Sequence, residues 1–238
     1  METSRKAQIK SRPLINAVVS APYTYLFINI IAIFLITPFG EARPQMIPLV
    51  ETGFFSMLVL VLWALRKGKG IITFFIVMIL FSIISDLFLF RQYDPDSKLS
   101  YSVYLKLLTP AVDGLLVLSV IVILLTTIFK ERQVSRDTLL GGITVYFLFG
   151  ILWTFFYRVI LIIDSNAISV TAGYFSISQL LYFSFMTLMT VGYGDILPLT
   201  PIARNLAILE AFVGQLYLAI FVSRLVGLHI SATNRLKN

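Results

Sequence analysis

The chain has 238 residues, 58% hydrophobic and only 13% charged, whereas a soluble domain usually carries about a quarter charged residues, so the composition indicates a membrane protein. Cysteine is absent, which excludes disulfides, thiolate metal sites and cysteine catalysis, and the single histidine, His229, leaves little room for a histidine-based active site. The net charge of +7 comes from bases that lie between apolar runs, which points to membrane topology rather than to nucleic-acid binding.

Six apolar runs are long enough for a helix to cross the hydrocarbon core, which takes about 20 residues. The first follows a basic segment, as in a signal peptide, but Pro22 and the apolar residues beyond it argue against cleavage, so we expect a retained span. A seventh run, 176–189, is too short to span and ends in a glycine-rich segment, which predicts a re-entrant helix and loop. The six expected transmembrane helices of this all-α membrane protein cover 21–39, 46–65, 71–90, 109–129, 139–163 and 202–228.

The distribution of lysine and arginine predicts the orientation. Thirteen of these residues fall in the N-terminal arm, the second and fourth connections and the C-terminal end, and six fall on the other side. We therefore expect a multi-pass protein of the cell membrane, with both termini in the cytoplasm and the re-entrant segment on the external face. The arms at both ends are short, so no cytoplasmic domain is expected, which favours a bacterial inner membrane.

The chemistry is expected in the segment Thr190-Val191-Gly192-Tyr193-Gly194-Asp195. A potassium ion must shed water to cross, and stacked rings of backbone carbonyl oxygens can replace that water. Successive carbonyls that point the same way require a backbone that glycine tolerates, which explains Gly192 and Gly194. Thr190 can add a hydroxyl oxygen, and Asp195 adds negative charge where cations arrive. Val191 and Tyr193 are expected to point away from the ion path and to brace the strand.

The preceding residues fit a short helix, capped by Ser176 or Ser178, whose partially negative C-terminal end points at the ion path. One loop cannot surround an ion, so several copies must form the ring. Fourfold symmetry is the natural choice.

The run from Thr187 to Asp195 resembles the signature of the potassium channel superfamily, and residues 139–230 resemble the pore domain of bacterial potassium channels. The resemblance implies a homotetramer in membrane lipid, with K+ as permeant ion and no organic cofactor. It also implies that the ion ligands are the carbonyls of Thr190, Val191, Gly192 and Tyr193. Residues 1–130 form a second module that matches no family motif. The plain alternative is a glycine-rich turn between two spans.

Three positions depart from the family pattern. Met189 stands where relatives commonly have threonine, and it would narrow or dry the inner mouth of the filter. Met186 replaces a glutamate that many relatives carry in the pore helix. Tyr182 stands where relatives often have a tryptophan that bonds the filter aspartate, and its hydroxyl could substitute. These changes bear on filter stability and inactivation rather than on selectivity.

The last span offers further candidates. Gly214 is expected either to let the helix bend as a gating hinge or to permit close helix packing. Glu210 is expected to brace the filter through Ser184 or Thr187, or else to face the cavity and attract cations. Four residues at helical spacing are expected to line the inner cavity, although the same spacing also fits a face packed between helices: Gln215, Leu218, Val222 and Val226.

The first four spans lack the arginine ladder of a voltage sensor, because the run 109–129 holds only one charge, Asp113. Glu51, Asp86 and Asp113 are expected at similar depth near the external face, where they could form a sensor of pH or calcium. Alternatively, each carboxylate pairs with one of the nearby bases Arg43, Arg91 and Lys106.

The preferred function is a potassium-selective channel subunit that conducts passively and is not an enzyme, since no nucleophile–base pair or metal constellation appears. A potassium transporter subunit is a second candidate, but such transporters carry four degenerate loops in one chain. A non-conducting regulatory subunit is a third. The sequence leaves the gating stimulus and the physiological role open.

Overall fold

The computed structural model describes residues 21–41, 68–91, 103–131, 135–169 and 176–235, and every structural statement below concerns these residues. This part of the chain is helical, with one isolated β-bridge between Ile168 and Pro198. Its helices are α3 (Pro22–Glu41), α5 (Lys69–Arg91), α6 (Val103–Ile128), α7 (Arg136–Ile163), α8 (Ile177–Leu188) and α9 (Pro201–Arg235).

The helices coincide with the predicted runs, apart from two ends and one span. The predicted span 46–65 lies outside the described residues. α6 begins at Val103 rather than at 109, and α9 continues to Arg235 rather than to 228, because a helix that satisfies its own backbone can extend past the apolar stretch into polar surroundings. Three helical segments are long and apolar enough to cross a membrane: Lys106–Ile128, Arg136–Ile163 and Pro201–Leu228.

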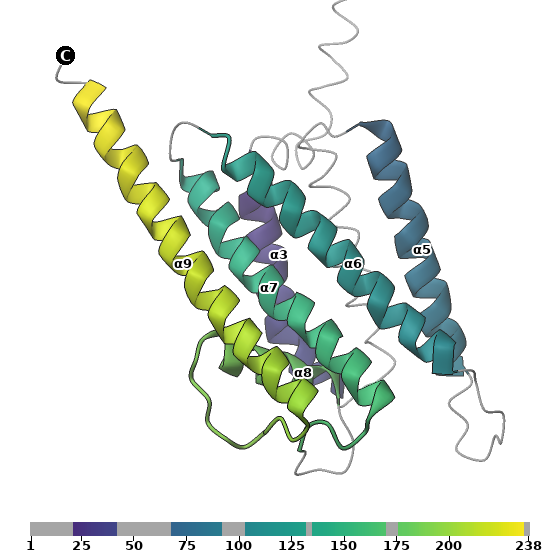
Figure 1. Ribbon diagram of the computed structural model, residues 1–238. Coiled ribbons are helices and arrows are strands. Elements are labelled where there is room, and N and C mark those ends of the chain that lie inside the picture. Colours follow the sequence, from purple (N-terminus) through teal and green to yellow (C-terminus); the bar gives the residue numbers. More distant parts are fainter. Residues whose placement is uncertain (1–20, 42–67, 92–102, 132–134, 170–175, 236–238) are drawn as a thin grey trace, which may run out of the picture.

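Figure 1 shows α9, α7, α6 and α5 following one another across the molecule, with α3 behind α7. α6 and α7 are joined by the short connection 129–135 and pack along each other as an antiparallel hairpin. α6 and α3 are therefore held against the same chain's α7, and α5 packs on α6. α8 lies at the end of the bundle opposite to the C-terminus of α9, beside α7 and α9.

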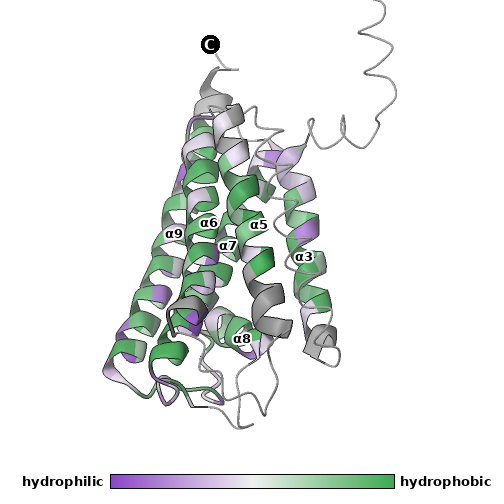
Figure 2. Ribbon diagram, turned by 90° about the vertical axis from the view of Figure 1, so that its right-hand side faces the viewer, coloured by the Kyte–Doolittle hydropathy of each residue, from purple (hydrophilic) through white to green (hydrophobic). Residues whose placement is uncertain are grey.

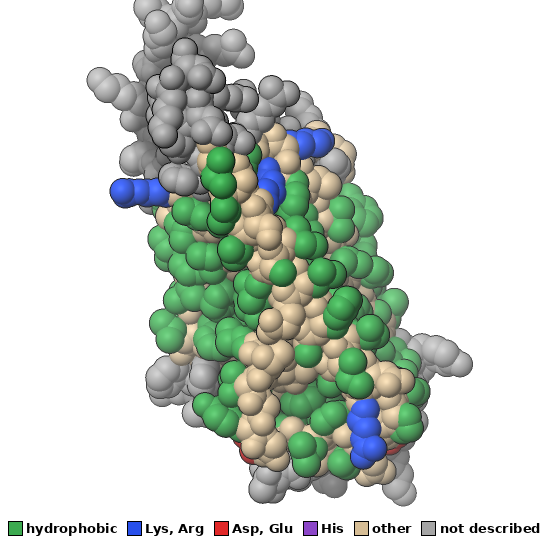
Figure 3. Space-filling view, turned by 60° about the vertical axis from the view of Figure 1, so that its left-hand side comes forward, with side chains coloured by type: hydrophobic (Ala, Val, Ile, Leu, Met, Phe, Trp, Pro, Cys, Tyr) green, Lys and Arg blue, Asp and Glu red, His purple; other side chains and the backbone are tan. Residues whose placement is uncertain are grey.

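The outer surface is that of a protein embedded in lipid. Hydrophobic residues extend along most of the length of the helices (Figure 2). In the face shown in Figure 3, lysine and arginine side chains gather toward the two ends, and apolar side chains cover the region between them. Many large apolar side chains are exposed in the isolated chain, for example Leu35, Ile84 and Ile208. This arrangement suits a hydrocarbon surrounding, where the helical backbone is internally satisfied.

α7 approaches its neighbours through glycines. Phe221 of α9 lies against Gly142, where an added Cβ would sit only 1.8 Å from the ring carbon Cζ. The Tyr217 hydroxyl donates a hydrogen bond of 2.7 Å to the Gly142 carbonyl. Within a membrane, small residues of this kind let helices pack by close contact where hydrophobic burial supplies little drive.

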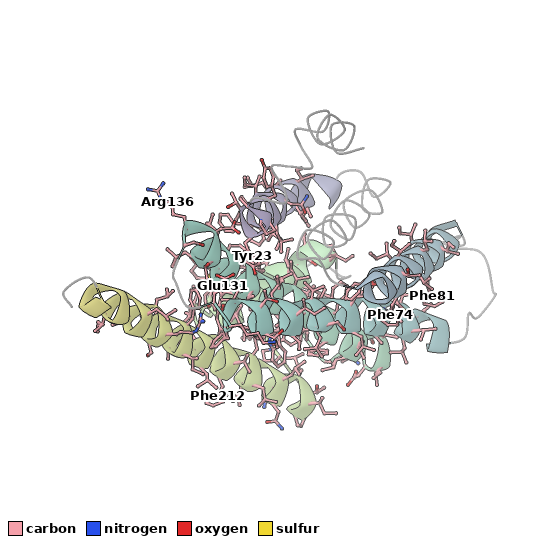
Figure 4. All side chains as sticks on the ribbon, turned by 90° about the horizontal axis from the view of Figure 1, so that it is seen from above. Tyr23, Phe74, Phe81, Glu131, Arg136 and Phe212 are labelled. Atoms are coloured by element: carbon pink, nitrogen blue, oxygen red, sulfur yellow. The ribbon has the colours of Figure 1, made fainter. Side chains whose placement is uncertain are left out.

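The end that carries the α6–α7 connection is joined to α9 by one arginine. The Arg224 Nη2 atom donates to the Glu131 backbone carbonyl at 2.8 Å, and the guanidinium lies 4.7 Å from the centre of the Phe129 ring. Such a cation–π contact adds to the hydrogen bond. Seen from above, Tyr23 and Glu131 lie near one another while Arg136 points away from the bundle (Figure 4). This end therefore links α3, α6 and α9.

Gly142→Ala should destabilise the fold by about 1–3 kcal/mol, because the new methyl group overlaps a buried ring that is already stacked on Tyr217. Thermal unfolding of the detergent-solubilised protein measures the effect. Gly114→Ala is the matched control, since its added Cβ would meet Phe155 at an ordinary 3.5 Å. Equal melting temperatures for the two variants would contradict the packing role of Gly142.

Candidate functional site

The start of the short helix α8 is fixed by side chains in its own first turn. The Ser176 side chain accepts from the Gln179 amide at 3.2 Å, and the Gln179 side chain accepts from the Ser176 amide at 3.3 Å. This reciprocal capping box satisfies two N–H groups that a helix end leaves unpaired. The helix has 12 residues and is too short to span a membrane. It packs at the end of the bundle, against α7 and α9.

The C-terminal end of α8 is closed by the residues that follow it. Helix ends leave their last carbonyls without intrahelical partners. Here the next four amides turn back and donate to those carbonyls, and the carbonyl of Leu188 accepts from the Tyr146 hydroxyl at 3.2 Å. The four backbone bonds are Met189 to Phe185 at 3.0 Å, Thr190 to Thr187 at 2.9 Å, and Val191 and Gly192 to Met186 at 2.8 and 3.2 Å.

The backbone then alternates in handedness. Positive φ angles occur at Thr190 (56°), Gly192 (55°) and Gly194 (80°). An added Cβ at either glycine would meet nothing within 4 Å, so glycine is required here by its φ angle and not by lack of space. The positive φ of Thr190 was not anticipated from the sequence. For a β-branched residue it is an outlier that costs about 1–3 kcal/mol and must be held by its surroundings.

The amides of residues 189–192 donate hydrogen bonds to carbonyls of α8, whereas the carbonyls of residues 190–193 accept none from the described residues. In the described part of the chain no hydrogen-bond donor meets the carbonyl oxygens of Thr190, Val191, Gly192 or Tyr193. Each such oxygen carries two lone pairs. A row of unpaired carbonyl oxygens can replace the hydration shell of a cation, provided that other oxygens complete the shell. The Gln215 side chain approaches this segment from α9, with its Nε2 atom 3.5 Å from Thr190 Oγ1.

The outer end of the segment has one side-chain contact to α8. The Tyr182 hydroxyl donates to Asp195 Oδ2 at 2.8 Å, which is the contact expected of a tyrosine that substitutes for the family's tryptophan. Tyr193 is 73% exposed and Val191 is exposed as well. The predicted bracing of the strand by these two side chains against the helix behind it is therefore not seen, since both side chains are exposed.

A buried carboxylate lies behind α8. Glu210 of α9 is fully buried, and its two oxygens meet Ser184 Oγ at 2.5 Å and the Tyr157 hydroxyl at 2.6 Å. Ser184 also contacts the Gly150 carbonyl at 2.7 Å, so its single proton is shared between two acceptors. The network joins α7, α8 and α9. Ser184 was an expected partner, whereas Tyr157 was missed because nothing in its local sequence distinguishes it from a core tyrosine.

Gly214 marks a close approach between α9 and the end of α8. An added Cβ would lie 2.6 Å from the Leu188 carbonyl oxygen and 2.9 Å from Leu188 Cδ1. The Leu188 oxygen is backbone and cannot swing aside. This geometry favours the packing alternative for Gly214, while the hinge remains a prediction.

The expected cavity-lining residues share one exposed face of α9. Gln215, Leu218, Val222 and Val226 are all exposed in the single chain, whereas Tyr217 and Phe221 on the other face are buried against α7. These four side chains therefore do not pack between helices of the same chain.

The expected external carboxylates are described only in part. Asp113 is buried and accepts a hydrogen bond of 2.6 Å from Ser82 of α5. Glu51 and the side chain of Asp86 lie outside the described residues. The sensor formed by the three carboxylates thus stays a prediction.

If the segment Thr190 to Asp195 is a selectivity filter, Gly214→Ala should disturb it as well as gating, because the new methyl group must push against the Leu188 carbonyl. We expect a lower fraction of conducting channels and an altered potassium-to-sodium permeability ratio in reconstituted protein. Gly227→Ala, on the same helix with open space around the added Cβ, should change neither quantity. Reduced opening with an unaltered permeability ratio would favour the hinge.

The comparison with protein families gives one match. A family model described as an ion channel matches residues 111–229, which is half of the chain. The matched region begins inside α6 and contains α7, α8, the segment Thr190 to Asp195 and most of α9. Comparisons with curated proteins and with solved structures give no significant match.

Proposed function

The chain belongs to the ion channel family, and we propose that it is a subunit of a potassium-selective channel with the segment Thr190 to Asp195 as its filter. One observation carries the proposal: the amides of Thr190, Val191 and Gly192 bond back to α8, and in the described part of the chain the carbonyls of Thr190 to Tyr193 have no donor, beside positive φ angles. Dehydrated K+ would bind to rings of these oxygens and move from one ring to the next.

Four copies would complete the pore. One chain supplies one strand of oxygens, so a ring requires association about a common axis. The exposed face of α9 with Gln215, Leu218, Val222 and Val226 would line the cavity below the filter. Another exposed side chain of α9, Phe212, projects away from the other helices (Figure 4) and would meet a neighbouring subunit or lipid. The distribution of lysine and arginine supports cytoplasmic termini.

Two polar contacts would support the filter. The bond from Tyr182 to Asp195 holds its outer end, and the network of Glu210, Ser184 and Tyr157 holds α8 from behind. A buried carboxylate in a membrane protein needs partners, and here two hydroxyl groups provide them. We propose that this network takes the place of the pore-helix glutamate that Met186 replaces.

Opening would not depend on an arginine ladder. Lys106, near the start of α6, is the one basic residue in that helix, and the remaining charge is Asp113. One charge near the helix end cannot supply the gating charge of a steep voltage sensor. We therefore expect another stimulus to open the channel.

Flux measurements separate the three candidate functions. Reconstituted protein should carry K+ in preference to Na+ down a gradient, and external barium should block the flux. A transporter would show saturation and coupling to a second ion. Absence of flux from the purified protein, with restoration by a second subunit, would favour a regulatory subunit.

Gly192→Ala should abolish potassium selectivity. The site has room for a methyl group, so the defect comes from forcing an L-residue to a positive φ at about 1–2 kcal/mol in every subunit. Bi-ionic permeability of K+ against Na+ measures the effect. A variant that keeps wild-type selectivity would exclude this segment as the filter.

Tyr157→Phe should weaken the filter more than Tyr182→Phe. Loss of the Tyr157 hydroxyl leaves a buried oxygen of Glu210 without a donor, at a cost of about 1–3 kcal/mol. Asp195 is exposed, and water can replace the Tyr182 hydroxyl there. The rate of current decay at constant K+ and the melting temperature should both rank the variants in this order. The reverse order would place the main support at Asp195.

A further inference from the structure

The ring of Phe185 fixes α8 against α7. Phe185 is almost fully buried, and its ring fills a notch at Gly150, where an added Cβ would lie 2.6 Å from ring carbon Cε2. The Gly150 carbonyl also meets Ser184, the residue before Phe185. One side of the ring is thus fixed by the backbone of α7.

The other sides of the Phe185 ring meet two more phenylalanines. Its centroid lies 5.4 Å from that of Phe147 on α7 and 5.1 Å from that of Phe34 on α3. Phe34 and Phe147 in turn lie 6.2 Å apart, edge to face. These three residues form a closed set of pairwise ring contacts, which we call the phenyl cluster. Pairs at these distances and angles are the geometries that aromatic rings prefer.

The phenyl cluster lies next to the residues that hold the filter. The Phe185 carbonyl accepts from the Met189 amide, and the following residue, Met186, accepts from the amides of Val191 and Gly192. A small rotation of α8 about its axis would move these carbonyls together. The position of Phe185 therefore decides where the filter backbone is held.

We propose that α3 positions the filter, with Phe34 as the positioning residue that presses Phe185 into the Gly150 notch. The inference rests on the proposed function of the segment Thr190 to Asp195. It goes beyond the family relationship, because α3 lies outside the matched residues 111–229. It gives α3 a role in the pore of the same chain.

The contact acts through shape rather than through burial of apolar surface. Phe34 is 38% exposed, and in a membrane lipid tails would cover any apolar surface that it left. Helix contacts in lipid depend on close packing, since apolar surface gains no hydrophobic free energy by moving from lipid to protein. Loss of the Phe34 ring should therefore loosen α8 without unfolding the bundle.

Phe34→Ala should speed the decay of potassium current about 2- to 10-fold, as expected from loss of aromatic pair contacts. The matched control is Leu35→Ala, because Leu35 is the next residue of α3 and is 63% exposed. Phe34→Leu, which restores volume without the ring, should recover part of the wild-type rate. Gly150→Ala should reproduce the fast decay by displacing Phe185 from the other side. All variants are compared as full-length protein in liposomes.

Hydrogen–deuterium exchange gives a readout that does not require conduction. Amides 189–192 should exchange faster in Phe34→Ala than in Leu35→Ala, while amides 144–158 of α7 stay protected in both. Equal exchange and equal current decay in the two variants would overturn the role of Phe34. If the wild-type protein carries no selective K+ current but the exchange difference persists, the proposed function fails and the structural role of α3 stands.

Discussion

Every other feature of the candidate pore depends on the bonds between the filter amides and the last carbonyls of α8. The Met186 carbonyl accepts from two amides, Val191 and Gly192, and the neighbouring carbonyls accept from Met189 and Thr190. These bonds close a helix end that would otherwise be unsatisfied inside a membrane. They also fix the backbone of Thr190, Val191 and Gly192 relative to α8. Because the backbone of the candidate filter is bonded to the end of α8, the geometry of this segment depends on the position of that helix.

The contacts that place α8 differ in character. Glu210, Ser184 and Tyr157 form a buried polar network, where a missing partner is costly because no water can replace it. Gly150 and Gly214 act by close approach, since each lets a partner, Phe185 or Leu188, occupy the space of a side chain. The bond between Tyr182 and Asp195 is exposed and therefore the most easily exchanged with solvent. The buried contacts of Glu210, Ser184 and Tyr157 are thus harder to replace by solvent than the exposed bond between Tyr182 and Asp195.

The short connection between α6 and α7 has a structural consequence for the earlier helices. It keeps α6 along its own chain's α7, and α3 packs on the other side of that helix. The division into residues 1–130 and 139–230 describes the sequence motifs, but in space α3 reaches α8 through the ring of Phe34. At the opposite end Arg224 joins α9 to Phe129 and Glu131. α3 therefore contacts the candidate pore at α8, and the connection that follows α6 contacts it at the opposite end.

The sequence by itself determined the membrane class, the positions of the described helices apart from the start of α6 and the end of α9, and the candidate filter, because these follow from local hydrophobicity and from glycines at alternate positions. It also singled out Tyr182, by comparison with a family pattern, and Glu210, as a carboxylate within an apolar span that needs a partner. It did not reveal Tyr157, Gly150 or Phe34, since a tyrosine, a glycine or a phenylalanine in an apolar run has the same local signature whether it faces lipid or a partner helix. The strained φ of Thr190 was also hidden, because threonine does not favour that conformation and adopts it only where α8 holds the next amides. The rotation and crossing angles of the helices fix which apolar side chains come into contact. Only the tertiary structure decides these angles, because lipid would solvate the apolar faces equally well in many other helix arrangements.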